Sequence, residues 1–386
     1  MDSLLLVAND LFHHHEHRIR HLAAFLESLA PLRKVSLVPP GIGISGDQAP
    51  PGSPLRGWPR RVVGEGCPLI WLAGTTTAVR RSPLPSLLGP VINRVMLRTA
   101  LRAVAPVEKV ALVQGPVPAM ACRDRGIRFI YDHADDYGGG RVDGPHRWIL
   151  NRWQECALRG ATSVSCAGFS LQRHAAETGA KSTHLYPNGV HTRLFGLPRA
   201  ESPEPTILYV GGLERDCGLD VVLRAFPLMK REIRIVVAGD GPARRPLASL
   251  AQRLGLASFV TWHGSISSNA TPPLMAAAWV GLAILPPTRW NRYAFHLKIL
   301  EYMAAGLPFV TTPVGDGARI ARESGAGVVT RPEPSAVAAC LTELLDAADR
   351  RTGMSLRGRE TAAQYDWNVI GPRFARWVRA TLAEMA

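Results

Sequence analysis

The sequence of 386 residues is poor in lysine, has no clustered cysteines and has no long hydrophobic run. Its longest apolar stretch, residues 274–285, falls short of the roughly 20 residues that a membrane-spanning helix needs. The first residues, 1–8, lack the basic region, long apolar segment and cleavage site of a secretory signal. We therefore expect a cytoplasmic protein, and peripheral contact with the inner face of the membrane stays open.

Several classes of cofactor protein are disfavoured by what is missing. The six cysteines form no C-x-x-C pair, which excludes a zinc framework and a disulfide scaffold. No G-x-G-x-x-G motif opens either half of the chain, so a nicotinamide-dependent dehydrogenase is disfavoured. His13, His14, His15 and His17 follow the first apolar run, but no second set of converging ligands can be identified. We expect neither a metal nor another cofactor.

The chain carries a formal net charge of +14, and most of the excess lies in its first half. Residues 1–200 hold 24 basic and 14 acidic residues, against 21 and 17 in the remainder. This excess favours an anionic partner, such as a lipid-phosphate acceptor or an anionic membrane surface. A basic nucleic-acid or membrane-surface binding protein is therefore one hypothesis. No basic groove interleaved with aromatic residues is found, so we expect no nucleic-acid partner.

Short apolar runs bounded by turn residues alternate with helical patterns, which predicts parallel sheets covered by helices. Residues 196–206 hold three prolines and no apolar periodicity, so we expect a linker there. We therefore predict two tandem Rossmann-like, doubly wound α/β domains with a cleft between them. The first spans residues 1–195, the second spans residues 207–365, and a last helix, residues 366–386, crosses back to the first.

The strongest chemical signal lies in residues 293–312, YAFHLKILEYMAAGLPFVTT. The pattern predicts a helix that follows a strand-end loop and ends at Gly306. Free N–H groups at the beginning of such a helix favour a phosphate. Lys298 and Glu301 lie three residues apart, so an ammonium could counter a diphosphate while a carboxylate accepts hydrogen bonds from a ribose. A surface ion pair is the simpler interpretation of this spacing.

Five motifs occur in series along the chain: PNGV at 187–190, YVGGL at 209–213, AGDGP at 238–242, VTWHGSIS at 260–267 and HLKILEYMAAGLPFVTT at 296–312. Singly they are weak, but in this order they resemble the GT-B glycosyltransferases, particularly the glycosyl transferases group 1 family. The resemblance spans about residues 4–367. It implies that a nucleoside-diphosphate sugar binds to the second domain and an acceptor to the first.

The resemblance assigns roles to residues that match the motifs. Glu301 matches the glutamate that binds the nucleotide ribose, and Lys298 matches a basic residue found in a subset of relatives. His263 and Gly264 fall on the loop that commonly meets the base. Glycines at strand ends let the donor approach the backbone closely. We therefore include the turn residues Gly211, Gly212, Gly239 and Asp240 in the candidate site.

Two departures from the family pattern concern the donor. Many relatives carry a glutamate eight positions before Glu301 that touches the sugar, and here that position is Tyr293. Relatives also hold the diphosphate with an arginine and a lysine, where this chain has Gly212 and Cys217. We expect Lys298, the helix N-terminus and Arg215 or Arg292 to take their place.

In the first domain, FIYDHADDYGGG at residues 129–140 places titratable side chains at the end of a strand. His133, Asp135 and Asp136 are candidates for proton transfer or for stabilising charge in the transition state. A solvated acidic turn or a helix cap is the alternative. In the family, this loop often supplies a histidine that contacts the donor sugar or an acid near the acceptor. The resemblance favours retention of anomeric configuration, and inversion stays open.

We therefore predict a glycosyltransferase that moves a sugar from a nucleoside-diphosphate sugar, such as a UDP-sugar, to an acceptor hydroxyl. A glycan, a lipid-linked acceptor and a small natural product are all compatible with the sequence. A GT-B sugar-nucleotide epimerase, which needs no acceptor, is the alternative enzyme.

Overall fold

The structure, a computed structural model, describes residues 4–8, 18–27, 32–38, 69–71, 76–80, 88–104, 110–139 and 146–385. The chain divides into two compact units. Unit 1 comprises Met1–Pro187 with Gly371–Ala386, and unit 2 comprises Asn188–Ile370. His13–His17, the histidine-rich segment of the sequence, lie outside the described residues.

Unit 1 is built on a sheet in the order β3-β4-β2-β1-β5-β6-β7-β8. Its strands are β1 (Leu4–Ala8), β2 (Leu32–Val38), β3 (Leu69–Trp71), β4 (Thr76–Arg80), β5 (Val110–Gln114), β6 (Arg128–His133), β7 (Ser163–Cys166) and β8 (Thr183–Leu185). All neighbours are parallel except β3 and β4, which are antiparallel. Because helices cover both faces of the sheet, β6 is buried along its whole length after Arg128.

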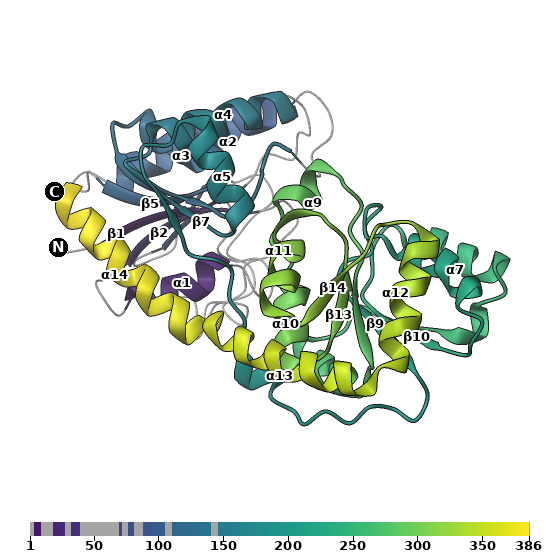
Figure 1. Ribbon diagram of the computed structural model, residues 1–386. Helices are drawn as coiled ribbons and strands as arrows, with labels where there is room; N and C mark the ends of the chain where they lie inside the picture. Colours follow the sequence, from purple (N-terminus) through teal and green to yellow (C-terminus); the bar gives the residue numbers. More distant parts are fainter. Residues whose placement is uncertain are drawn as a thin grey trace. The chain divides into compact units, whose positions relative to one another are not determined.

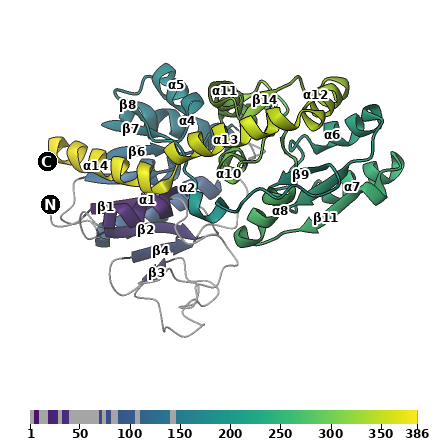
Figure 2. The ribbon, with the colours of Figure 1, turned by 60° about the horizontal axis from the view of Figure 1, so that its bottom comes forward.

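Helices α2, α3, α4 and α5 cover one face of this sheet, and α1 and α14 cover the other (Figure 1). Their bounds are α1 (Arg18–Glu27), α2 (Leu88–Val104), α3 (Pro116–Arg123), α4 (His146–Gly160), α5 (Phe169–Thr178) and α14 (Trp367–Met385). Figure 2 shows α14 running alongside α1. A Cβ on Gly371 of α14 would stand 2.1 Å from the ring of Phe25 in α1, so this close approach needs a glycine.

Unit 2 has a fully parallel sheet in the order β11-β10-β9-β12-β13-β14. Its strands are β9 (Thr206–Val210), β10 (Arg234–Ala238), β11 (Val260–Gly264), β12 (Val280–Ala283), β13 (Phe309–Thr311) and β14 (Gly327–Val329). Its helices are α6 (Leu219–Ala225), α7 (Arg244–Arg253), α8 (Thr271–Ala277), α9 (Arg289–Tyr293), α10 (Leu297–Ala305), α11 (Gly315–Ser324), α12 (Pro334–Asp346) and α13 (Ala348–Gln364). One apolar core includes side chains of α6, α7 and α12, and a second includes those of α8, α10 and α11. The prediction of two doubly wound parallel-sheet domains is confirmed.

The linker predicted at residues 196–206 is not where the chain divides. The division falls between Pro187 and Asn188, and the predicted linker belongs to unit 2. Its prolines prevent regular structure but do not prevent packing, because its polar groups are bonded to the body of unit 2.

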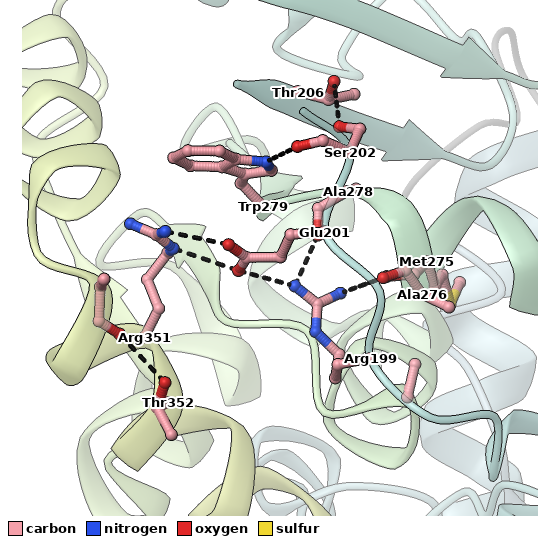
Figure 3. A network of polar contacts seen from close by, with 12 residues as sticks. Arg199, Glu201, Ser202, Thr206, Met275, Ala276, Ala278, Trp279, Arg351 and Thr352 are labelled. Atoms are coloured by element: carbon pink, nitrogen blue, oxygen red, sulfur yellow. Dashed lines mark hydrogen bonds and ion pairs between the residues drawn. The ribbon is translucent and has the colours of Figure 1, made fainter. Parts of the chain in front are cut away.

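Figure 3 shows the network that fastens this segment. Glu201 accepts hydrogen bonds from Arg351 of α13 at 3.0 and 3.2 Å, and Arg199 donates to the carbonyl oxygen of Ala278 at 2.6 Å. The Trp279 indole donates to the carbonyl oxygen of Ser202 at 2.8 Å. The segment is therefore a fixed part of unit 2.

Candidate active site

The order of strands in unit 2 reverses between β9 and β12. The chain builds β9, β10 and β11 outward and then returns to place β12 beside β9. In open parallel sheets, ligands bind at such a reversal, outside the carboxyl ends of the strands. The loops that follow these strands hold most of the donor-binding residues predicted from the sequence.

Three glycine-containing turns meet at this edge of the sheet. The N–H of Gly211 donates to the carbonyl oxygen of Ala238 at 2.9 Å, and that of Gly239 donates to Gly264 at 2.8 Å. Gly239 has φ 153°, and a Cβ there would stand 1.9 Å from the carbonyl oxygen of Gly211. Only glycine fits this position, since both the dihedral angle and the space exclude a side chain. The structure therefore brings Gly211, Gly239 and Gly264 together.

Lys298 reaches the same place from α10. Its Nζ lies 4.0 Å from the centroid of the Tyr209 ring and 3.1 Å from where a Cβ on Gly211 would stand. The buried Tyr209 donates its hydroxyl to the carbonyl oxygen of Gly212 at 2.8 Å. The small residue at 211 leaves room for the ammonium, and the ring face attracts it. Sequence reasoning missed Tyr209, whose place inside an apolar strand indicated only a core residue.

The predicted helix is α10, which begins later than the sequence indicated, and a separate short helix, α9, lies in the strand-end loop before it. α9 ends at Tyr293, and α10 begins at Leu297, because Phe295 between them is buried in the core of unit 2. Lys298 is thus the second residue of α10, and the half-buried Glu301 follows almost one turn later. Gly306, in the left-handed region at φ 67°, ends α10 as the sequence predicts.

Asn291 joins the loops on the two sides of the strand reversal. Its side-chain amide donates to the carbonyl oxygens of Asp216 and Pro286 at 3.2 and 3.0 Å. Thr288 caps α9 by accepting from the Asn291 N–H, and its hydroxyl donates to the Asp216 carboxylate at 3.2 Å. The loop after β9 is therefore fastened to the loop after β12. Thr288 three residues before Asn291 is a helix-start signal that could have identified this contact.

Four further predicted donor residues have exposed side chains at the carboxyl ends of the same strands: Arg215, Asp240, His263 and Arg292. The Asp240 carboxylate accepts a hydrogen bond from the N–H of Gly241 at 2.8 Å, which shapes the turn after β10. The exposed Gly212 lies beside Glu214. These side chains face solvent, whereas Lys298 lies against the backbone of the site.

In unit 1, a buried network fixes the strand that leads into the candidate catalytic loop. Asp132, at the end of β6, accepts hydrogen bonds from Arg18 at 3.1 Å, from Gln114 at 3.1 Å and from Ser165 at 2.6 Å. Arg18 and Asp132 are both buried, so losing either one would leave an uncompensated buried charge. Asp132 belongs to the segment 129–140 that the sequence pointed to, but no sequence pattern indicated Arg18 as its partner.

His133 is enclosed within unit 1. Its Nε2 lies 3.3 Å from Nδ1 of His174 on α5, and burial, with a smaller effect of His174, lowers the pKa of His133 to about 3. Its Nδ1 has no hydrogen-bond partner among the described residues. The imidazole is therefore neutral at pH 7. A direct role in proton transfer would require the side chains around it to move.

The structure separates the two carboxylates that follow. Asp136 is 1% exposed and accepts a hydrogen bond from Gln154 of α4 at 3.2 Å. Gln154 in turn accepts from the N–H of Tyr137 at 2.9 Å. Asp135 is half-buried, and it accepts from the N–H of Asp136 at 2.9 Å. Asp135 is therefore the carboxylate that is more open to a substrate.

Other features of the described residues lie away from these loops. A pocket of about 530 Å³ in unit 1 is lined by Arg123, Arg128 and Arg159 among others, at the amino end of β6. It is therefore at the opposite edge of the sheet from Asp135. No group of three His, Cys, Asp or Glu side chains in the described ranges could hold a metal ion. None of the described helices has the length and apolar character to cross a membrane.

Comparison with known proteins identifies the fold. Residues 204–347 match the family model Glycosyl transferases group 1, which places the match on unit 2. Sucrose-phosphate synthase from Thermosynechococcus elongatus has a TM-score of 0.76 at 15% identity, and all of both chains is covered. HepE of Anabaena, in complex with UDP, has a TM-score of 0.71 at 16% identity, with 98% of this chain and all of that chain covered. The chain has the GT-B fold, and the resemblance seen in the motifs is confirmed.

Curated relatives are similar over part of their length. A GDP-mannose-dependent alpha-(1-6)-phosphatidylinositol monomannoside mannosyltransferase of Mycobacterium tuberculosis is 28% identical over 232 residues, or 55% of this chain and 60% of the relative. Alpha-D-kanosaminyltransferase of Streptomyces kanamyceticus is 28% identical over 176 residues, or 44% of each chain. The chain thus matches about half the length of these two relatives.

Proposed function

We propose that the protein is a glycosyltransferase that moves a sugar from a nucleoside-diphosphate sugar to an acceptor hydroxyl. The observation that carries this proposal is the position of Lys298. Its ammonium lies at the backbone of Gly211, where β9 ends, and Glu301 follows almost one turn later on the same helix. This arrangement offers a cation to a diphosphate and a carboxylate to the two hydroxyls of a ribose.

The glycine turns support the same assignment. Gly211, Gly239 and Gly264 present backbone to the site without side chains, so a flat base and a ribose can approach closely. The N–H groups in the first turn of α10 add a partial positive charge beside Lys298. Exposed Arg215 and Arg292 would supply further cations from the loops after β9 and β12.

The protein's contribution to the reaction would be orientation and charge stabilisation. Lys298 and the start of α10 would stabilise the departing diphosphate, which lowers the barrier to breaking the bond between the sugar and its phosphate. In an inverting reaction the base that takes the acceptor proton would be Asp135, because Asp136 is buried and bonded to Gln154. We favour retention, in which the residues of unit 1 would only position the acceptor.

Lipid-linked acceptors are included in the proposal because a similar protein is named for a phosphatidylinositol monomannoside. Contact with the inner face of a membrane would then bring enzyme and acceptor together. A GT-B epimerase is not favoured, since the relatives named above are transferases. Consumption of the donor that depends strictly on an acceptor would distinguish the two activities.

The proposal is tested by measuring the melting temperature with UDP-, GDP- and dTDP-sugars. A ligand that binds only the native state at about 100 times its dissociation constant stabilises the protein by roughly 2.7 kcal/mol. Glu301→Gln should weaken binding of the preferred nucleotide about 10- to 150-fold, because hydrogen bonds to a charged group are worth about 1.5–3 kcal/mol. The weakening should disappear when the ribose hydroxyls are absent from the ligand.

The control is Glu360→Gln, which makes the same change at an exposed position on α13. It should leave nucleotide binding unaltered. If no nucleotide raises the melting temperature of the wild-type protein, or if both variants bind equally well, the proposed donor site is incorrect.

A further inference from the structure

Two neighbouring helices of unit 1 present an unusual combination of exposed side chains to solvent. On α2, exposed residues recur at Val91, Val95, Arg98 and Arg102, a spacing that places them on one face of the helix. Val91 is 40% exposed and Val95 is 49% exposed. The helix contains three arginines and no acidic residue. Its solvent face is therefore apolar toward its beginning and basic toward its end.

α4 repeats this pattern. Trp148 in its first turn is 69% exposed, the largest exposed fraction among the large hydrophobic residues that the structure describes. Arg152 follows one turn later and Arg159 two turns after that, and both are exposed. Glu155, the one acidic residue of this helix, forms exposed ion pairs with Arg152 at 3.3 Å and Arg159 at 3.8 Å, which are weak in water. An exposed tryptophan beside arginines is typical of the boundary between water and lipid, where an amphipathic ring and a long basic side chain are both favoured.

The two faces belong to one surface. The guanidinium of Arg94 on α2 lies 5.1 Å from the centroid of the Trp153 ring on α4, so the helices are in contact. Figure 1 shows both on the same face of the unit 1 sheet. Together they carry six arginines and one acidic residue, and Arg94 forms an ion pair with Asp124 after α3, so the pair of helices keeps a net positive charge. Such a surface repels a second copy of itself and attracts an anionic one.

The apolar end of this surface lies at the candidate catalytic loop. Strands β4, β5, β6 and β7 are parallel, so α2 and α4, which connect them, begin at the carboxyl ends of the strands. Arg147, next to Trp148, donates to the carbonyl oxygens of Gly138 and Gly139 at 3.2 and 3.4 Å. The exposed tryptophan is thus one residue from the arginine that holds the end of the Asp135 loop.

We propose that the solvent face of α2 and α4, formed by Val91, Val95, Arg98, Arg102, Trp148 and Arg152, docks onto an anionic phospholipid surface. Trp148 and the valines enter the headgroup region, and the arginines contact lipid phosphates. Docking in this way places the Asp135 loop beside the lipid headgroups. The functional meaning of this surface rests on the proposed transferase activity, because it would present a lipid-linked acceptor to unit 1. The binding itself does not depend on that activity.

The test is co-sedimentation of the full chain with vesicles of phosphatidylcholine alone and of phosphatidylcholine mixed with phosphatidylglycerol. Wild-type protein should bind the anionic vesicles, and binding should weaken with added salt. The double variant Arg98→Gln/Arg102→Gln should bind about 25-fold more weakly, or about fivefold for each arginine removed. The control Arg253→Gln/Arg322→Gln removes two exposed charges from unit 2 and should stay within about twofold of wild type.

A second pair of variants tests the apolar part of the surface. Trp148→Ala should lower vesicle binding, whereas Leu356→Ala, which removes a residue of similar exposure (67%) on α13, should not. Nucleotide affinity and melting temperature, measured on every variant, show whether each is folded. The proposal is overturned if the two double variants lose binding equally, if wild type binds neither vesicle, or if it binds a single-stranded RNA but no lipid. If the wild-type protein binds no nucleotide, the proposed function is overturned instead.

Discussion

Replacing Lys298 by methionine removes the ammonium but keeps the length of the side chain. The ammonium lies 3.1 Å from the position of a Cβ on Gly211, so a phosphate oxygen outside this turn would come within hydrogen-bond distance of it. Hydrogen bonds to charged groups are worth about 1.5–3 kcal/mol. We therefore expect Lys298→Met to weaken binding of a nucleoside diphosphate by about 10- to 150-fold.

The same change should have little effect on the folded protein itself. In the free protein, the ammonium interacts with the face of Tyr209 at 4.0 Å, and a half-exposed contact of this kind is worth about 0.5–1 kcal/mol. The methionine side chain keeps most of the apolar packing. A drop in stability of at most about 1 kcal/mol is therefore expected alongside the much larger loss of nucleotide affinity.

Titration calorimetry with a nucleoside, its monophosphate and its diphosphate provides the assay. The loss should be absent for the nucleoside and largest for the diphosphate, because the cation contacts only phosphate. Lys181→Met, at an exposed position in unit 1, is the matched control and should bind all three as wild type does. An affinity for the diphosphate within threefold of wild type in Lys298→Met would refute the assignment of this residue.

Three further predictions concern the turns of unit 2 and the loop of unit 1. Gly239→Ala should lower the free energy of unfolding, measured in urea, by several kcal/mol, because the new Cβ would collide with the carbonyl oxygen of Gly211. Its control, Gly255→Ala, lies at φ 73° with open space around it and should lower the free energy of unfolding by about 1 kcal/mol. Asp135→Asn should lower turnover in an inverting reaction while nucleotide binding is kept, and unchanged turnover would exclude a base at this position. The folded protein should lose stability as the pH falls from about 6.5 toward 3, since His133 stays neutral in the folded state while the unfolded chain takes up a proton there. His133→Phe should reduce this pH dependence, as measured by urea unfolding at pH 7.5 and 5.0.

The sequence predicted the elements that local pattern determines. Parallel strands that are buried on both faces read as short apolar runs, and the glycine stop after α10 has a local cause, so both were predictable. Lys298 and Glu301 could be selected because their spacing on one helix is a local property. The match of residues 204–347 to a family model lies where these patterns are strongest.

Contacts between residues distant in sequence could not be predicted in this way. Arg18 and Asp132 are 114 residues apart, and nothing local links them. The segment at residues 196–206 was misjudged for the same reason, because its packing depends on Arg351 in α13. The enclosure of His133 depends on α5, which packs against the end of β6 only in the folded unit. The local sequence pattern therefore predicted which side chains lie near the site, but it did not predict which of them are accessible to a substrate.

Cys217, where this chain departs from the motif pattern that it resembles, interacts electrostatically with Lys298. Cys217 is buried against the core of unit 2, and burial raises the pKa of its thiol, an effect that Lys298 partly opposes. A lysine at position 217 would thus place its charge in a buried, apolar site. The ammonium of Lys298 nearby would repel it. Restoring the family's residue by Cys217→Lys should therefore lower the stability by about 3 kcal/mol or more, with no gain in diphosphate affinity.

Cys217→Ala, which keeps the site apolar, should be tolerated with a loss of about 1 kcal/mol and should leave diphosphate binding unaltered. Urea unfolding and nucleotide titration of the two variants separate stability from binding. If Cys217→Lys were stable and bound the diphosphate more tightly than wild type, the loop after β9 would still be able to hold the phosphates in the way that the motif resemblance implies. The ammonium that α10 brings to Gly211 would then be an addition to that mode of binding and not its replacement.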